Sequence, residues 1–351
     1  MSAADYNILE QLPEAALQIR DGQLVYANSM AKHYLPQLTE GSMLPAELDF
    51  PVTQPSCAGT FTLGQSTYSF RMTLTTEGQT LLFRPAPQSA LTDLQLEGAL
   101  AQLRQFLGEF SAELGPYTTG EDKPLSAAAK TGFLKSYHRA FRLINNMDYL
   151  RQAGSAEGIS FRSSTLDLAG LCRQLCLAAG DLLAETNTSL HLDACPNSLL
   201  IPGDAGLLQR LLLGLIANSA KAAKGGSIHL DLRTRGNRAI LTLSDSGAPL
   251  SPRQMAAMLQ QDNDHSIPMP GQGAGLGLAI ARHIVALHRG TLLVEWGDCS
   301  PIVRVALPLG PLDHRLSVET PRADHSGGLS PLFVELADVL PANLFEQESL
   351  D

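Results

Sequence analysis

The chain has 351 residues, more than one hydrophobic core usually organises, so its length predicts two or three domains. Apolar residues make up 44% of it and charged residues 17%, a composition typical of folded globular proteins and contrary to large-scale disorder. The net charge is −10 and no basic run is interleaved with aromatic residues. Direct binding of DNA or RNA is therefore not expected.

The sequence also indicates a cytoplasmic protein. Its longest apolar runs are far shorter than the roughly 18 to 20 residues that span a bilayer, so no membrane span is expected. The opening MSAADYNILEQLPE does not read as a secretory signal, and five scattered cysteines do not form a disulfide framework. Cys172 and Cys176 are spaced to share a metal ion on a helix, but small apolar residues at this spacing more often belong to a core.

Residues 1–88 are expected to form a small antiparallel sheet around a short helix. Two apolar runs in LQIRDGQLVYAN are joined by Asp21-Gly22, a hairpin turn signal, and GTFTL, STYSFRMTLT and QTLLFRP read as further strands. The segment LPEAALQIRDGQLVYANSMAKHYL resembles the start of a PAS domain, a sensory fold. The resemblance implies a PAS-like sensor domain.

Residues 89–155 are expected to form a helical hairpin. The first helix carries a heptad seam of apolar side chains: Leu96, Leu100, Leu103, Leu107, Phe110 and Leu114. The second, from about Ser126, carries a matching stripe: Leu134, Tyr137, Phe141, Ile144 and Met147. Two copies could bury these faces in a four-helix homodimer. The alternative is a hairpin that packs within one chain, on the sheet domain.

Residues 156–312 alternate helices and strands. Helices are predicted over 168–185, 205–224 and 277–288, with strands at SLHLDA, TLLVEW and IVRVALPL and a hairpin in SIHLDLRTRGNRAILTLSD. This order predicts an α/β sandwich with helices on one face of an antiparallel sheet, within an α+β multidomain chain.

Residues 313–351 form a tail with eight acidic and two basic residues. Its segment SPLFVELADVLPANLF has a Ser330 N-cap, Pro331 in the first turn and helical apolar spacing. We expect a helix that packs back onto the protein; a docking helix for a partner is the alternative.

Three segments of the third domain indicate phosphate chemistry. In LLLGLIANSAKAA, Asn218 lies mid-helix among apolar residues with Lys221 three positions later, which predicts a buried Asn that needs partners. A strand ending in LTLSDSGAP delivers the carboxylate of Asp245, with Gly247 beside it. The segment GQGAGLGLAIARHIVALH leads into a helix whose first amides favour phosphate, and its glycines are Gly271, Gly273, Gly275 and Gly277.

Together and in this order, the segments resemble the N, G1 and G2 boxes of the Bergerat ATP-binding fold, shared by histidine kinases, DNA gyrase B, Hsp90 chaperones and MutL. The resemblance implies that Asn218 ligates Mg²⁺ through ATP, Lys221 contacts phosphate and Asp245 reads the adenine amine. It also implies a lid and nucleotide-binding set that includes Gly247, Gly273, Gly275, Leu276 and Gly277.

Residues of about 90 to 310 resemble sensor histidine kinases in particular. FLGEFSAELGP is similar to their phosphoacceptor box, but Ala112 stands where the family has histidine. A phosphoramidate needs an imidazole nitrogen, and a methyl group offers none. Glu113, the family's general base, is then vestigial. His138 on the second hairpin helix is a candidate substitute acceptor, although a solvated or helix-packing role is the more common one.

Further departures concern affinity and hydrolysis. Pro249 replaces the second glycine of the G1 box, and Ile302 falls where the family has a threonine near adenine. Gly214 stands where MutL-like ATPases carry the glutamate that activates water, which disfavours an ATP hydrolase. His283 and His288 are expected to be structural.

These features predict a homodimeric pseudokinase of two-component signalling that binds ATP and Mg²⁺ without autophosphorylation, its sensor coupled to the ATP site through the hairpin. A response regulator is the expected partner. The alternative is an active histidine kinase that uses His138 or a partner's histidine.

Overall fold

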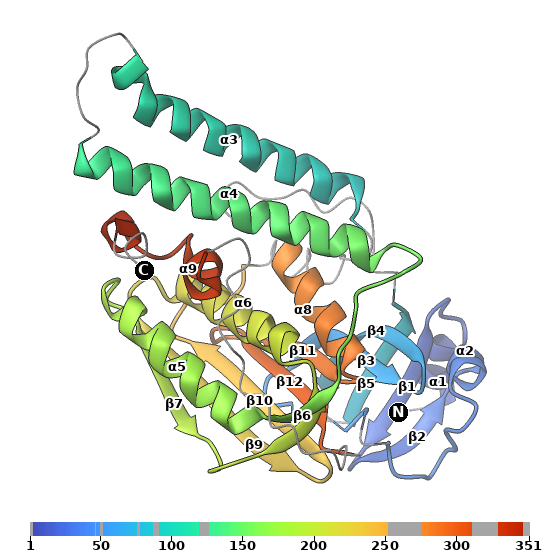
Figure 1. The fold of residues 1–351 in the computed structure, drawn as a ribbon. Helices are drawn as coiled ribbons and strands as arrows, with labels where there is room; N and C mark the ends of the chain where they lie inside the picture. Colours follow the sequence, from blue (N-terminus) through green and yellow to red (C-terminus); the bar gives the residue numbers. More distant parts are fainter. Residues whose placement is uncertain are drawn as a thin grey trace.

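The computed structural model describes residues 3–45, 47–49, 52–75, 78–86, 91–118, 126–251, 275–310 and 329–346. A sheet of ten strands runs through two lobes in the order β2-β1-β5-β4-β3-β11-β12-β10-β9-β7. The first five of these strands come from the N-terminal lobe and the other five from the third predicted domain (Figure 1).

The N-terminal lobe contains α1 (Ala3–Glu10), β1 (Ala15–Arg20), β2 (Gln23–Ala27), α2 (Ser29–Tyr34), β3 (Ser56–Leu63), β4 (Ser66–Thr75) and β5 (Gly78–Pro85). Its strands pair antiparallel, as the alternating sequence predicts. The hairpin at Asp21-Gly22 is confirmed, and both residues take the positive φ of a tight turn, 53° and 76°. This lobe has its own aromatic core around Phe61 and Phe83.

β3 joins this lobe to the rest of the protein. It pairs antiparallel with β11 (Thr291–Trp296), from Phe61 opposite Thr291 to Ser56 opposite Trp296. Leu293 of β11 also packs into the N-terminal core. The lobes are therefore joined directly, in addition to the coupling through the hairpin that the sequence predicts.

A buried carboxylate stabilises this junction. Glu295 is 0% exposed and accepts hydrogen bonds from the Thr53 amide (2.7 Å), the Thr53 hydroxyl (2.8 Å) and the Gln54 amide (3.0 Å). Arg304 on β12 (Ile302–Pro308) pairs with the same carboxylate. A buried charge persists only with such partners, so the loop before β3 is tied to β11.

The predicted hairpin is formed by α3 (Asp93–Thr118) and α4 (Ala127–Ala153), which lie side by side (Figure 1). The heptad seam of α3 is divided between two surfaces. Leu103 and Phe110 of the seam are half-buried against the core, beside the buried Ala99 and Phe106, which do not belong to the predicted seam. Leu96, Leu100 and Leu107 form an adjoining exposed stripe, with Leu107 62% exposed. α4 packs its other side on the third domain and the tail.

The third domain confirms the predicted helices α5 (Leu168–Ala184), α6 (Ala205–Ala223) and α8 (Leu276–Leu287). Its other strands are β6 (Ser164–Asp167), β7 (Ser189–Ala194), β8 (Leu200–Gly203), β9 (Ser227–Arg235) and β10 (Arg238–Asp245). β6 and β8 form a separate two-stranded sheet. The sheet departs from a purely antiparallel one because β7 pairs parallel with β9. α6 lies between these two strands in the chain and supplies the crossover that parallel pairing requires.

The tail packs back onto the protein, as expected. It forms α9 (Pro331–Leu336) and a 3-10 turn, η2 (Ala342–Glu346). Leu336, Leu340 and Phe345 are each 0% exposed and belong to the same core as α4 and α6.

Gly59 permits the close approach of β3 to β11, since a Cβ there would lie 2.0 Å from the Leu292 carbonyl oxygen. We expect Gly59→Ala to lower the free energy of unfolding by about 1–3 kcal/mol, through the strain of a forced contact. Thermal denaturation measures this. Gly108→Ala is the matched control, because a Cβ on this α3 residue meets nothing within 4 Å. Equal stability of the two variants would contradict the close approach.

Candidate functional site

α6 presents two of the predicted site residues on one face. The helix begins after Asp204, whose side chain accepts a hydrogen bond from the Leu207 amide at 3.0 Å, and it ends at Lys224 in a left-handed conformation. Its apolar side packs into the core, whereas Asn218 and Lys221 are exposed. The expectation of a buried Asn218 is wrong, because its neighbours Ala217 and Ser219 take the buried positions. An exposed amide is open to a ligand instead.

The first turn of α8 lies beside Asn218. A Cβ on Gly277 would lie 3.7 Å from Asn218 Nδ2 and 3.9 Å from its Oδ1. Gly275 precedes the helix with a φ of +69°, which favours glycine, and Leu276 is buried beneath it. The free amides of α8 therefore begin next to the amide of Asn218. Gly271 and Gly273 lie outside the described residues.

Asp245 stands at the end of β10, where the strand gives way to a turn. Its Oδ1 accepts the Gly247 amide at 2.9 Å and the Ser300 hydroxyl at 2.7 Å. A Cβ on Gly247 would lie 2.7 Å from that oxygen and 2.9 Å from the Ala222 carbonyl, so this position has no room for a side chain. One carboxylate oxygen is thus fixed by two donors. Both of these donors bind Oδ1, so neither contact involves Oδ2.

Ser300 is a site residue that sequence reasoning missed. Ile302, at the predicted threonine position, pairs with Ser244 in the β10–β12 ladder and offers no hydroxyl. Ser300 lies two residues earlier and supplies the hydroxyl to Asp245 from the turn after β11. The sequence signal that could have identified Ser300 is a hydroxyl residue two positions before the predicted threonine position.

Lys221 is engaged by the tail. Its ammonium forms an ion pair with Oδ2 of Asp338, 117 residues further along the chain. The Lys221 side chain is 39% exposed and that of Asp338 is 24% exposed, so the ion pair is open to solvent on one side. Nothing in the sequence links these two positions.

The two predicted acceptor positions, Ala112 and His138, lie on different helices of the hairpin. Ala112 is an exposed residue of α3, and Glu113 follows it in the same helix. His138 is 2% exposed, lies near the Leu134 carbonyl (Nδ1 to oxygen, 2.7 Å) and has the ring of Phe345 at 4.9 Å. The helix-packing role expected for His138 matches this geometry.

Other candidate groups have structural roles. His288 accepts the Asp204 amide at 3.0 Å, and His283 lies 2.9 Å from the Tyr149 hydroxyl; burial lowers the pKa of both imidazoles. Burial raises the pKa of Cys176 to about 12, as suits a core thiol. Within the described part of the chain, no three His, Cys, Asp or Glu side chains are grouped to hold a metal ion.

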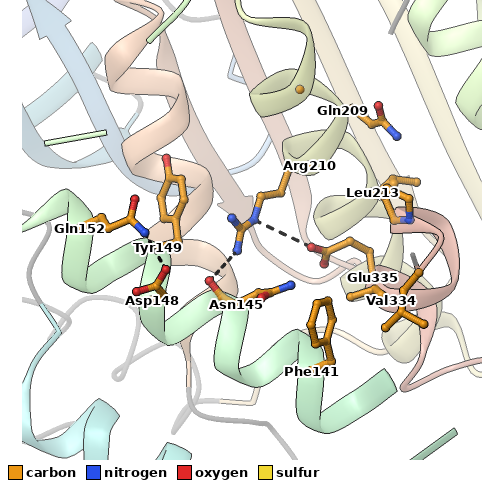
Figure 2. A pocket seen from close by; sticks show the side chains of 13 residues that line it. Phe141, Asn145, Asp148, Tyr149, Gln152, Gln209, Arg210, Leu213, Val334 and Glu335 are labelled. Atoms are coloured by element: carbon orange, nitrogen blue, oxygen red, sulfur yellow. Dashed lines mark hydrogen bonds and ion pairs between the residues drawn. The ribbon is translucent and has the colours of Figure 1, made fainter. Parts of the chain in front are cut away.

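A cavity of about 400 Å³ lies between α4, α6 and the tail. Figure 2 shows Arg210 of α6 extending across it between Asn145 of α4 and Glu335 of α9. The guanidinium donates to the Asn145 carbonyl at 3.2 Å and lies 3.9 Å from the Glu335 carboxylate. It also lies over the ring of Tyr149, 4.6 Å from its centroid. These contacts bridge three elements, so the cavity is a junction between them.

Among the described residues, each helix is too short or too polar to cross a membrane.

Known proteins resemble parts of this chain. Residues 203–311 match a family described as histidine kinase-, DNA gyrase B-, and HSP90-like ATPase. The heme sensor protein HssS of Staphylococcus aureus is 33% identical over 110 residues, which cover 31% of this chain and 24% of HssS. The chain thus matches about a quarter of the length of this relative.

Solved histidine kinases align with it more weakly. Acinetobacter baumannii AdeS gives a TM-score of 0.48 at 18% identity and covers 60% of this chain and 98% of its own. ThkA, solved in complex with the response regulator protein TrrA, gives a TM-score of 0.46 at 14% identity and covers 87% of this chain and 98% of its own.

The family match includes Asn218 of α6, Asp245 at the end of β10 and Gly277 in the first turn of α8. By the family match, residues 203–311 are a histidine kinase-, DNA gyrase B-, and HSP90-like ATPase domain.

Proposed function

We propose that the protein is an ATP-binding, cytoplasmic signal-transduction component of the sensor histidine kinase type that does not phosphorylate itself on the usual histidine. The observation that carries the proposal is the fixed carboxylate of Asp245, one oxygen of which is held by Gly247 and Ser300. The proposal assigns its other oxygen to a ligand. A carboxylate held this way selects an amine donor such as that of adenine.

The surrounding residues fit a nucleotide. Asn218 is exposed beside the N-terminus of α8, where amides favour phosphate, and Gly277 leaves the space between them open. The amide oxygen of Asn218 is a suitable ligand for Mg²⁺ bound with ATP. Gly214 has open space above it and no side chain, so it offers no base to activate water. Binding without hydrolysis is the activity that this set supports.

Loss of the acceptor motivates the pseudokinase part of the proposal. Ala112 has no nitrogen to form a phosphoramidate, and the ring of His138 is buried beneath Phe345. ATP then acts as a ligand that changes the population of conformations. In this proposal residues 1–88 are the PAS-like sensor, 89–155 a degenerate dimerisation hairpin and 156–312 the ATP-binding domain.

A second copy of the chain is the proposed partner of the hairpin, and a response regulator the proposed signalling partner. Leu96, Leu100 and Leu107 are 38%, 39% and 62% exposed on one stripe of α3, while Tyr137 and Ile144 of α4 are 43% and 51% exposed. Exposed large apolar side chains at helical spacing are typical of interfaces between helices.

For nucleotide binding, we expect Asp245→Asn to weaken Mg-ATP affinity by about 1–3 kcal/mol, because a charge-assisted hydrogen bond is lost. Ser300→Ala should weaken it less, by about 0.5–1.5 kcal/mol, because the carboxylate loses one neutral donor and keeps Gly247. Titration calorimetry measures both. Asp181→Asn, an exposed change on α5 with the same change in charge, is the control. Absence of wild-type binding at millimolar Mg-ATP would refute the proposal.

For autophosphorylation, we expect no acid-labile, base-stable label on the wild-type protein after incubation with γ-labelled ATP, because the nucleophile is missing. Restoring an imidazole by Ala112→His provides a gain-of-label comparison. Label on the wild type would overturn the pseudokinase reading. Its loss in His138→Gln would then assign the acceptor to His138.

For assembly, we expect a homodimer by light scattering at tens of micromolar protein, and a monomer for Leu107→Glu, because a charge cannot be buried unpaired in a helical interface. Gly108→Glu is the matched control. This neighbouring residue is also exposed on α3, but it does not belong to the stripe of Leu96, Leu100 and Leu107. A monomeric mass for the wild type would contradict the dimer.

A further inference from the structure

The tail places two carboxylates among four cations of α4 and α6. Asp338 lies 3.1 Å from Arg139 Nε and 2.8 Å from Arg142 Nη1, and it also pairs with Lys221. Glu335 lies 2.9 Å from Arg142 Nε and 3.9 Å from Arg210 Nε. Both hairpin and ATPase domain thus bind the same short acidic segment.

The charges around Asp338 outweigh the effect of its burial. Burial alone would raise the pKa of Asp338, but the charges of Lys221, Arg142 and Arg139 hold that pKa well below its usual value. Phe345 is fully buried and packs its ring 4.9 Å from His138 and 5.5 Å from Phe333. The segment is therefore held by apolar contacts on α4 and by charge at Asp338.

Asp338 is the point at which the tail meets the nucleotide site. Its partner Lys221 lies one helical turn after Asn218, on the exposed face of α6. Arg139 and Arg142 come from α4, so a single carboxylate connects the hairpin to Lys221, the residue that the sequence resemblance predicts to contact phosphate. A carboxylate and a phosphate oxygen are alternative anionic partners for one ammonium group.

We propose that residues 329–346 are an autoinhibitory clasp in which Asp338 competes with the phosphates of bound nucleotide for Lys221. The inference rests on the proposed nucleotide site. With the clasp engaged, α4 is fixed against α6 and Lys221 is withheld from the ligand. When nucleotide takes Lys221, Asp338 loses its only partner on α6 among the described residues, and the clasp keeps only the arginines of α4 and the contacts of Glu335.

Competition makes the coupling reciprocal, since two ligands that exclude each other weaken each other by the same factor. Nucleotide should then loosen the tail as much as the tail weakens nucleotide. Adenosine has no phosphate and makes no demand on Lys221, so its affinity should not depend on Asp338. This difference separates competition for Lys221 from a general change in the fold.

The test compares the full-length wild type with Asp338→Asn by titration calorimetry, using Mg-ATP and adenosine as probes. Asp338→Asn keeps the Glu335–Arg142 pair, so the buried guanidinium retains a partner. We expect the variant to bind Mg-ATP about three- to tenfold more tightly, within the range typical of coupling between sites, and to bind adenosine as the wild type does. The charge-matched control Asp181→Asn should leave both affinities unchanged.

Hydrogen exchange of the wild type provides the second measurement, in case the substitution perturbs folding. Saturating Mg-ATP should speed amide exchange in residues 329–346, and adenosine should not. Equal Mg-ATP affinity of the wild type and Asp338→Asn, with unchanged exchange in the tail, would overturn the clasp while the nucleotide site stands. If neither protein binds Mg-ATP, the proposed function itself fails and the clasp fails with it.

Discussion

Backbone pairing between β3 and β11 is the contact on which the arrangement of the molecule depends. It makes one sheet from two sets of strands, and it brings the buried carboxylate of Glu295 under the loop at Thr53. Because the ladder joins the N-terminal lobe to the ATPase domain, the two lobes cannot separate without breaking a row of hydrogen bonds. The hairpin, whose helix α4 packs on α8, is thus a second connection between lobes that are already in contact (Figure 1).

Ion pairs connect the ATPase domain to the hairpin and the tail. Arg139 and Arg142 of α4 and Lys221 of α6 converge on Asp338, and Arg210 links α6 to Asn145 of α4 (Figure 2). Partly buried ion pairs of this kind add little net stability, because the cost of desolvating the charges offsets their attraction. The contacts nevertheless hold the hairpin, the ATPase domain and the tail in one defined orientation.

The helices of the ATPase domain and the first hairpin of the N-terminal lobe were predictable because their sequence signals are local. Apolar periodicity located α5, α6 and α8, and Asp21-Gly22 located the first hairpin. Burial was less predictable: apolar neighbours suggested a buried Asn218, yet it is exposed between the buried Ala217 and Ser219.

The contacts that were missed are those between distant positions. Ser300 and Asp245 are 55 residues apart in the chain, and Asp338 and Lys221 are 117 residues apart. The pairing of β3 with β11 belongs to the same class, because strand patterns identify strands but not their partners. The pattern on α3 likewise predicted one apolar seam, and only the packing of α4 divides it into a covered and an exposed stripe.

Continuity of the sheet limits how the protein can be taken apart. All six residues of β11 are buried in the intact protein, and β3 occupies one of its edges. A fragment cut at the predicted domain boundary near residue 88 would carry β11 with that edge bare, and a long apolar edge strand recruits strands from other molecules. Exchange of the N-terminal lobe for another sensor meets the same obstacle, since the replacement must bring a strand that fits beside Leu293 with no side chain at the position of Gly59. The boundary between the N-terminal lobe and the ATPase domain is therefore a pair of hydrogen-bonded strands and not a linker.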